Sequence, residues 1–547
     1  MKVKNPILRG FYPDPSIIRV GDDYYIANST FEWWPGVSLH HSKDLVHWEK
    51  LPSPLNRQSQ LDLRGVGASQ GIWAPCLTYD NGIFYLVYTV VKSFYCNMYD
   101  TANFLVTATD ILGPWSEPTP LNNFGFDPSL FHDDDGRKYM VSMVTDHRVP
   151  KKYAGRLVLQ EYDPQEKKMV GPVREIFCAD KVYLEGPHIF KRKDWYYLFA
   201  ADTGTGEGHG QSILRSKNVW GPYEWYEKNS ILTAREHPDF LLQKSGHCDL
   251  VETQNGDWYA VHLCGRALEN RNPADARRFA GDRRYPIGRE TSIQKMKWTD
   301  DDWLVLANGT TLPDLETEIS DALVPEKFRN CEQSYEPDNS MFDDFDDPNG
   351  LSVCYQTLRQ PLTPGYYSLT ERPGYLRLRG HEGLSSKFEQ SLIARRWEEF
   401  CFEAETCVEF EPDVFKQMAG LILMYDQDNY FYLHVTFDEE LGKCITLLTA
   451  ENKKYQYPVG YLPIEVGKPV RLKATVDHDK AQFFYAVGDE DYQTIGPVLD
   501  ASILSDEACN EGWFTGAMVG ICCQDLTGFK KEADFDWFSY QNKKKKS

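Results

Sequence analysis

Residues 127–141 read DPSLFHDDDGRKYMV, and the pattern in this stretch recurs along the first part of the chain. An Asp-Pro-Ser word opens a short apolar segment, a polar turn follows at residues 133–137, and Tyr139 lies in a second apolar segment. Two short apolar segments separated by Asp and Gly are typical of a β-hairpin. Four further stretches of the chain begin in the same way, so this hairpin is one copy of a repeat.

A tyrosine in the second strand marks the register of each copy. The tyrosines are spaced 60, 54, 58 and 62 residues apart, and they are Tyr25, Tyr85, Tyr139, Tyr197 and Tyr259. A period of this length filled with short strands indicates a repeat architecture. A radial array of all-β blades is a β-propeller. The sequence therefore predicts an all-β protein that begins with a five-bladed β-propeller.

The residue 12 positions before each tyrosine, or 11 in the first copy, differs from copy to copy. These residues are Asp14, Trp73, Asp127, Glu185 and His247. Equivalent positions in the blades of a propeller lie at equivalent radius and height. We therefore expect one pocket near the axis that holds three carboxylic acids, a Trp and a His. This composition is typical of a sugar-cleaving site.

A simpler interpretation of Asp-Pro-Ser is a turn, since Asp and Pro favour turns for their own reasons. A single word of this kind would favour the turn, but three acids in register favour a site. Hydrolysis of a glycosidic bond needs two carboxyl groups across the bond. One must be protonated to donate to the leaving oxygen, and the other must be ionised to activate water or attack directly.

The repeat ends near residue 311, although strands continue beyond it. We assign residues 1–311 to the propeller, 312–339 to an acidic, irregular linker and 340–547 to a second domain. Apolar and polar residues alternate at 402–410 and 470–476, which predicts strands with one buried and one wet face. Several such strands with polar turns between them predict a β-sandwich of the jelly-roll or lectin-like kind.

Composition excludes several classes of function. The formal net charge of −22 argues against a nucleic-acid or anionic-membrane partner, and we interpret the lysines at 543–546 as a solvated tail. We find no apolar run of membrane-spanning length and no signal-peptide core after Met1. The thirteen cysteines have no Cys-x-x-Cys spacing, so neither a disulfide framework nor a zinc site is indicated. We expect a cytoplasmic protein with reduced thiols.

Four words of the repeat resemble glycoside hydrolase family 43, and in detail its β-xylosidases with a C-terminal sandwich. The words are GFYPDPS at 10–16, GIWAP at 71–75, GFDPS at 125–129 and EGPH at 185–188. The resemblance covers nearly the whole chain. It implies a five-bladed propeller and single-displacement hydrolysis with inversion. It also implies removal of terminal D-xylose from the non-reducing ends of β-1,4-xylooligosaccharides, which are the expected partner.

The resemblance assigns roles to the three acids. Asp14 matches the family's general base, and Glu185 matches its general acid. Asp127 matches a third acid that orients the general acid and raises its pKa, because a nearby carboxylate disfavours ionisation of its neighbour. Inversion needs a gap of roughly 6.5–9.5 Å between base and acid, so that a water molecule fits. No cofactor is implied as a requirement.

The resemblance also implies a substrate pocket. Arg289, in the word GRET at 288–291, would bind sugar hydroxyls, with a structural ion pair as the alternative. Phe31, Trp73 and Phe126 would form the apolar walls of the terminal xylose subsite. His247 would hold the pocket. A metal at His247, such as Ca²⁺ near the propeller axis, is a further alternative, although a lone His is a weak metal signal.

The sandwich is expected to reach into this pocket. The word GWFTGA at 512–517 resembles the family's loop that inserts a phenylalanine, here Phe514, at the pocket wall. Trp513 precedes it directly, so the sequence leaves open which ring points inward. A pocket closed on one side explains exo action, because only a chain end can enter.

Other functions remain open at this point. Related propellers cleave α-L-arabinofuranosides, so arabinofuranosidase or dual activity is an alternative. A retaining fructosidase also joins a five-bladed propeller to a sandwich, but it would have an Asn-Asp-Pro nucleophile word where YPDP stands at 12–15. A non-catalytic carbohydrate-binding propeller would not need all three acids. The sequence is compatible with a homo-oligomer and does not fix the oligomeric state.

Overall fold

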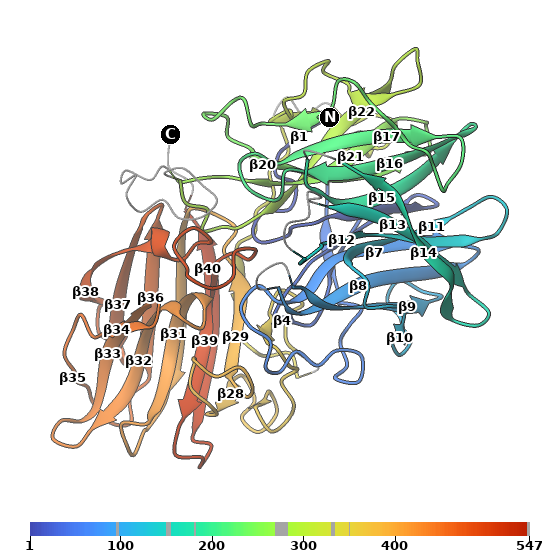
Figure 1. Ribbon diagram of the computed structural model, residues 1–547. Coiled ribbons are helices and arrows are strands. Elements are labelled where there is room, and N and C mark those ends of the chain that lie inside the picture. Colours follow the sequence, from blue (N-terminus) through green and yellow to red (C-terminus); the bar gives the residue numbers. More distant parts are fainter. Residues whose placement is uncertain are drawn as a thin grey trace.

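The computed structural model describes residues 1–94, 98–148, 155–179, 182–268, 283–329, 334–348 and 350–543. Figure 1 shows two β-domains side by side, a propeller from the N-terminal part of the chain and a sandwich from the C-terminal part. The described helices are two short 3₁₀ turns, η3 (Glu326–Phe328) and η4 (Ala501–Ile503). Within these residues no helix has the length and apolar character needed to cross a membrane.

Five antiparallel sheets form the propeller, as the repeat predicts. In chain order their strands are β2 (Ser16–Val20), β3 (Asp23–Asn28), β5 (Ser38–Ser42) and β6 (Glu49–Leu51); β7 (Gly71–Asp80), β8 (Ile83–Ser93), β9 (Asp100–Ala108) and β10 (Thr119–Pro120); β11 (Phe126–His132), β12 (Lys138–Val144), β13 (Arg156–Asp163) and β14 (Lys168–Cys178); β15 (Leu184–Arg192), β16 (Trp195–Asp202), β17 (Gly210–Ser216), β18 (Glu224–Trp225) and β19 (Leu232–Thr233); and β20 (Gln243–Glu252), β21 (Trp258–Gly265), β22 (Glu290–Trp298) and β23 (Leu304–Leu306). The five register tyrosines all lie on the second strand of their blade.

The first strands of the blades surround the axis. Strand β2 contacts β7 and β20, β11 contacts β7 and β15, and β15 contacts β20. The first positions of the five repeats therefore come together in space, as their register predicts. The propeller also closes by strand pairing, because β1 (Lys2–Lys4) pairs with β24 (Glu316–Glu318). Strand β24 lies inside the segment 312–339 that we interpreted as a linker; the domain boundaries stay a prediction.

A β-bulge lies at the pocket position of four blades. The pairing of the first and second strands shifts register just after Trp73, Phe126, Glu185 and Gly246. The backbone φ is positive at a residue of this position in every blade, namely Asp14 (50°), Ala74 (33°), Asp127 (49°), Gly186 (54°) and His247 (56°). A bulge bends a strand and re-aims its side chains. The bulge in four blades, together with the positive φ found in all five, therefore turns side chains at this position into the pocket.

The C-terminal domain is a sandwich of two antiparallel sheets. The first contains β25 (Met341–Asp343), β27 (Tyr367–Ser368), β28 (Leu376–Arg379), β30 (Cys401–Glu409), β36 (Val470–Asp477), β37 (Lys480–Val487), β38 (Gln493–Asp500) and β40 (Glu532–Asn542). The second contains β29 (Ser391–Arg396), β31 (Gln417–Asp426), β32 (Asn429–Asp438), β33 (Gly442–Glu451), β34 (Lys454–Gln456), β35 (Leu462–Pro463) and β39 (Met518–Asp525). The alternation predicted at 402–410 and 470–476 corresponds to β30 and β36, whose apolar residues are buried between the sheets.

The second sheet of the sandwich packs against the propeller. One cluster of buried apolar side chains includes Phe31 and Trp73 of the propeller together with Leu392, Ile422 and Met518 of that sheet. Burying a large apolar side chain contributes about 1.5–3 kcal/mol relative to leaving it exposed. The two domains are therefore expected to unfold together and not independently.

Backbone and charged contacts reinforce this apolar interface. Strand β4 (Trp33–Trp34) of the first propeller repeat pairs with β26 (Thr357–Leu358), which lies between β25 and β27 of the sandwich in the sequence. The buried Arg396 of β29 donates from Nε to the carbonyl oxygen of Phe11 at 2.5 Å and from Nη2 to Ser38 Oγ at 3.0 Å. These contacts fix the sandwich against the segment that leads to Asp14.

Candidate active site

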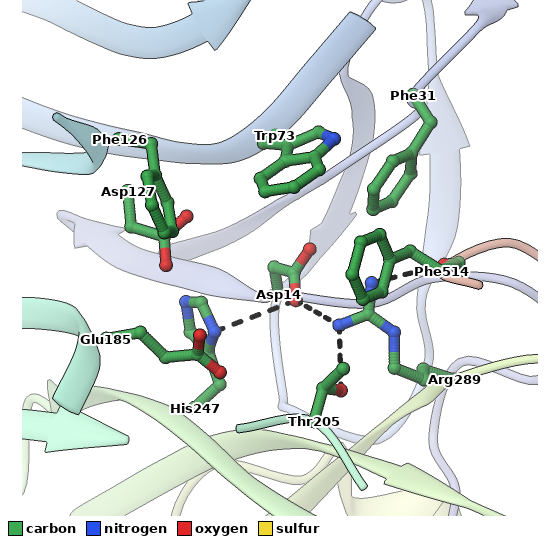
Figure 2. A pocket seen from close by; sticks show the side chains of 10 residues that line it. All are labelled: Asp14, Phe31, Trp73, Phe126, Asp127, Glu185, Thr205, His247, Arg289 and Phe514. Carbon is green, nitrogen blue, oxygen red and sulfur yellow. Dashed lines mark hydrogen bonds and ion pairs between the residues drawn. The ribbon is translucent and has the colours of Figure 1, made fainter. Parts of the chain in front are cut away.

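A single pocket near the propeller axis collects all the site residues that the sequence predicted (Figure 2). The pocket is lined by Asp14, Phe31, Trp73, Phe126, Asp127, Glu185, Thr205, His247, Arg289 and Phe514. The five residues of the repeat register come from the five blades. Arg289 precedes the third strand of the last blade, and Phe514 comes from the sandwich. Thr205 is the one lining residue that the sequence did not predict.

Asp14 is a buried carboxylate with three stabilising neighbours. Arg289 Nη1 lies 2.8 Å from Asp14 Oδ1, and His247 Nδ1 lies 3.6 Å from the same oxygen. Ser29 Oγ donates to Asp14 Oδ2 at 2.6 Å. Burial raises the pKa of Asp14, but Arg289, His247 and the Ser29 hydrogen bond lower it more, so that it lies below its ordinary value. Asp14 is therefore ionised at neutral pH, as a general base must be.

The pKa of Glu185 is shifted upward, opposite to that of Asp14. Burial and the negative charge of Asp14 raise the pKa of Glu185 to about 7, although the Arg289 charge opposes the shift. A carboxyl group with this pKa holds its proton in a large fraction of molecules near neutral pH. It can therefore donate that proton to a leaving oxygen.

Asp127 lies beside Glu185 and accepts a hydrogen bond at Oδ2 from the backbone N–H of Gly186 at 3.0 Å. Burial raises the pKa of Asp127 well above its ordinary value, and the charges of Glu185 and Asp14 raise it further. The sequence predicted that Asp127 raises the pKa of Glu185. In the structure the causes of that raised pKa are burial first and Asp14 next. The contact with Gly186 places Asp127 where it can orient the Glu185 backbone.

Glycine at 186 is required by a close approach of His247. A Cβ at Gly186 would lie 2.6 Å from His247 Nε2, and the backbone φ there is 54°. Burial lowers the pKa of His247 to about 4, so its ring is neutral. The neutral ring packs between the Asp14 carboxylate and the backbone that follows Glu185 (Figure 2). At neutral pH the ring separates the two acids without adding a charge, and only its protonated form, present near pH 4 and below, lowers the pKa of Asp14.

The residues around His247 do not fit a Ca²⁺ ion. Calcium takes six to eight oxygen ligands. The carboxylate in contact with His247 is Asp14, and Arg289 already pairs with it at 2.8 Å. A guanidinium at that distance occupies the position a second cation would need. A calcium site at His247 therefore stays a prediction that this donor set does not support.

Aromatic rings form the apolar wall of the pocket. Trp73 makes edge contacts with Phe126 at 5.6 Å and with Phe514 at 5.2 Å between ring centroids. Phe31 stacks on Phe514 at 6.0 Å. Figure 2 shows Phe31, Trp73 and Phe126 on one side of Asp14 and Glu185 and Arg289 on the other, with Asp127 beside Phe126. A sugar ring can pack its apolar face against such a wall, while the acids contact the polar edge of the sugar.

Phe514, and not Trp513, is the ring that lines the pocket. Trp513 turns away and makes an edge contact with Phe94 at 5.4 Å. The backbone N–H groups of Trp513 and Phe514 both donate to Ser69 Oγ, at 2.9 and 3.1 Å. This shared acceptor on the propeller fixes the loop, so the inward ring is set by a contact between domains.

Further contacts hold the sandwich loop at the pocket. Arg289 Nη2 donates to the carbonyl oxygen of Phe514 at 3.1 Å. A Cβ at Gly288 would lie 2.6 Å from the carbonyl oxygen of Thr515, so the loop approaches too closely for any other residue. Buried Lys244 of β20 pairs with Glu507 of the sandwich, with 2.7 Å between Nζ and Oε1. One arginine thus contacts both the proposed base and the loop that closes the pocket.

Three contributing residues were missed from the sequence. Thr205 Oγ1 accepts from Arg289 Nη1 at 3.2 Å, Ser29 donates to Asp14, and Ser69 accepts from the sandwich loop. They lie outside the repeat register and outside the motif words. Hydroxyl residues at such positions carry no periodic signal, so only the tertiary contacts identify them.

A propeller pocket with an ionised Asp, a protonated Glu and aromatic walls defines a class of carbohydrate-cleaving hydrolases. Comparison with known proteins agrees with this class. A model of the Glycosyl hydrolases family 43 matches residues 3–304, and a model of the Beta xylosidase C-terminal Concanavalin A-like domain matches residues 342–541. The chain belongs to glycosyl hydrolase family 43.

Similar proteins extend over the full length of the chain. A xylosidase/arabinosidase of Humicola insolens is 46% identical and covers 99% of this chain and 98% of its own. A β-xylosidase of Bacillus subtilis (strain 168) is 44% identical, covering 99% of this chain and all of its own. The crystal structure of a xylan β-1,4-xylosidase from Bacillus halodurans C-125 has a TM-score of 0.92 and 46% identity, over 99% of this chain and 100% of that one.

Proposed function

We propose that the protein is an exo-acting β-xylosidase that removes terminal D-xylose from the non-reducing ends of β-1,4-xylooligosaccharides with inversion. The observation that carries the proposal is that two acids in one pocket have pKa values shifted in opposite directions. Asp14 has a lowered pKa, and the pKa of Glu185 is raised to about 7. The names of the relatives, which are xylosidases or xylosidase/arabinosidases, support xylose as the sugar.

The proposed reaction is a single displacement. Asp14 accepts a proton from a water molecule, whose oxygen attacks the anomeric carbon of the terminal xylose. Glu185 donates its proton to the glycosidic oxygen as the bond to the anomeric carbon breaks. Attack from the face opposite the leaving group converts the β-linkage into α-xylose. Both proton transfers use carboxyl groups, so the reaction needs no cofactor, and EDTA should leave the rate unchanged.

The other lining residues orient the reactants in this proposal. Arg289 keeps Asp14 ionised and presents its remaining N–H groups to sugar hydroxyls. Asp127 holds the Gly186 backbone next to the acid. Phe514 from the sandwich closes one side of the pocket, which supports release of single terminal sugars over cleavage within a chain.

Proton NMR of xylobiose hydrolysis tests the proposal directly. Early appearance of α-xylose is expected, since inversion at a β-linked donor gives the α-anomer. Early β-xylose would show a retaining enzyme, and Asp14 would then have to be reconsidered as a nucleophile. Release of no xylose would contradict the proposed substrate.

A second activity, hydrolysis of α-L-arabinofuranosides, has support in the name of the Humicola insolens relative. Comparing kcat/KM for 4-nitrophenyl β-D-xyloside and 4-nitrophenyl α-L-arabinofuranoside measures it. If both reactions use one pocket, each substrate competitively inhibits hydrolysis of the other, and Asp14→Ala abolishes both.

A further inference from the structure

A second cavity lies between the first propeller blade and the sandwich, and it shares no lining residue with the carboxylate pocket. Its volume is about 480 Å³. Buried side chains of Tyr12, His40 and Arg395 line it, whereas Ser340 and Ser352 are exposed at its mouth. The cavity is therefore polar, open to solvent and large enough for a small solute.

Lys50 of β6 is half-buried as a residue, and its ammonium group lies in this cavity. Its Nζ is buried without a hydrogen-bond partner, and it lies over the ring of Tyr12 at 5.6 Å. Burial lowers the pKa of Lys50 to about 7, and the charge of Arg396 lowers it further. A buried ammonium group without a partner costs several kcal/mol unless it loses its proton or gains a counter-ion.

Other buried lysines of the described chain each have a carboxylate. Lys244 pairs with Glu507 at 2.7 Å, Lys443 with Glu411 at 2.7 Å and Lys138 with Asp80 at 2.5 Å. Among the described residues no carboxylate pairs with Lys50. Lys50 therefore differs from these three lysines in having no carboxylate partner.

Further unpaired donors surround the same space. Arg9, His40 and Arg395 line the cavity and are 4%, 4% and 3% exposed, and the Arg9 Nε, His40 Nδ1 and Arg395 Nε atoms have no hydrogen-bond partner. Glu398 also lines the cavity and already accepts from Arg395 Nη2 at 2.7 Å. The groups that face Lys50 are Tyr12, His40, Cys354, Arg395, Arg396 and Glu398. Arg9 is already paired with Glu336 and Glu399, and Asp338 also lines the cavity, whereas the Nζ of Lys50 has no partner.

We propose that this cavity binds a compact oxyanion of the phosphate or carboxylate class, with Lys50 as its main partner and Arg395 and His40 as further donors. Oxyanions accept several short charge-assisted hydrogen bonds, which this group of donors offers. An anion would favour the charged form of Lys50, so binding near pH 8 takes up a proton. The bound anion would also join the sandwich to Tyr12, two residues before Asp14.

Thermal unfolding of the full-length protein tests the site. Phosphate, glucose 6-phosphate and citrate are titrated separately, with sodium chloride at matched ionic strength as the reference. We expect a saturable rise in Tm with at least one of them, since a ligand that binds only the folded state stabilises it. The phosphate and citrate arms distinguish the two sources of oxyanion, and glucose 6-phosphate reports whether the cavity accepts a phosphate monoester.

Lys50→Met is expected to remove the rise in Tm, while xylosidase activity without added anion stays near the wild-type rate. Lys43→Met is the matched control, because Lys43 lies on the same blade, is 69% exposed and gives the same change in charge. An equal rise in Lys50→Met and the wild type, or the same rise with chloride, would overturn the proposal.

Calorimetry of the wild type provides a readout that does not depend on how the variant folds. Titrating the anion at pH 8 in two buffers of different ionisation enthalpy measures proton uptake. An uptake that approaches one proton per anion bound is expected if Lys50 becomes charged. Binding without proton uptake would place the anion elsewhere, and absence of binding would overturn the site.

Discussion

The propeller supplies charge to the pocket from equivalent positions of its blades, whereas the sandwich supplies a single ring from one loop. Asp14, Asp127 and Glu185 lie at the start of their repeats, and the local backbone turns each toward the axis. Phe514 has no repeat and depends on Ser69 and Arg289 of the other domain for its position. The reacting groups therefore belong to the propeller, whereas closure of the pocket depends on the interface between the two domains.

The acids and the ring also depend on different parts of the molecule for their positions. The acids are held by contacts within the propeller, so substituting them should change the reaction while the fold persists. The ring is held by an interface of many contacts, so the whole sandwich is needed to place it. Changing the sandwich, the acids and the ring separately tests this division.

Removing residues 340–547 should abolish activity completely. The truncation takes away Phe514 and exposes propeller rings such as Phe31 and Trp73 that are buried against the sandwich. We expect no xylose release and an aggregated or poorly folded fragment, measured by hydrolysis assay and size-exclusion chromatography. A soluble, fully active fragment would show that the pocket belongs to the propeller alone.

Asp14→Ala should lower kcat by about 10²–10⁴-fold, the range that a positioned general base contributes. Xylose binding should remain measurable by calorimetry, because the aromatic wall is intact. Asp22→Ala, which changes an exposed acid in the same blade, is the control and should keep the wild-type rate. Retention of more than a tenth of the activity in Asp14→Ala would exclude this residue as the base.

Glu185→Gln should affect poor leaving groups most. The amide cannot donate a proton, so hydrolysis of xylobiose should fall by about 10²-fold or more. An activated aryl xyloside, whose leaving group needs little protonation, should lose much less. Comparing kcat for the two substrates measures the difference. An equal loss for both would contradict the role of Glu185 as general acid.

The pH profile should report the two acids. Activity requires Glu185 with its proton, and its pKa is about 7, so kcat/KM should fall about tenfold per pH unit above that value. Asp14 must be ionised, and because its pKa is lowered, activity on the acid side should persist below the ordinary pKa of aspartate. An alkaline limit that is unchanged in Glu185→Gln would assign it to another group.

Phe514→Ala should raise KM by about 10- to 100-fold, through loss of roughly the 1.5–3 kcal/mol that burial of an aromatic side chain contributes. Trp513→Ala should have a smaller effect on KM, because Trp513 packs behind the wall and does not line the pocket. Steady-state kinetics of both variants with xylobiose test the assignment. A larger rise in KM for Trp513→Ala would reverse it.

Much of the pocket could be predicted from the sequence because equivalent positions in the repeats of a propeller lie at the same distance from its axis. The spacing of the tyrosines placed Asp14, Trp73, Asp127, Glu185 and His247 at one radius, and the structure brings them together. The resemblance of the motif words added Arg289 and Phe514. The alternating strands of the second domain were visible as well, because burial on one face of a sheet leaves a period of two.

Tertiary structure alone decided features that join segments far apart in the chain. The choice between Trp513 and Phe514 depends on Ser69, more than four hundred residues away. The pairing of β24 with β1 makes part of the expected linker an element of the propeller closure. The causes of the raised pKa of Glu185, and the unpaired Lys50 in its cavity, likewise depend on what surrounds each group. Periodicity records which face of a strand is buried, whereas hydrogen bonds and charges depend on distances that only the folded chain sets.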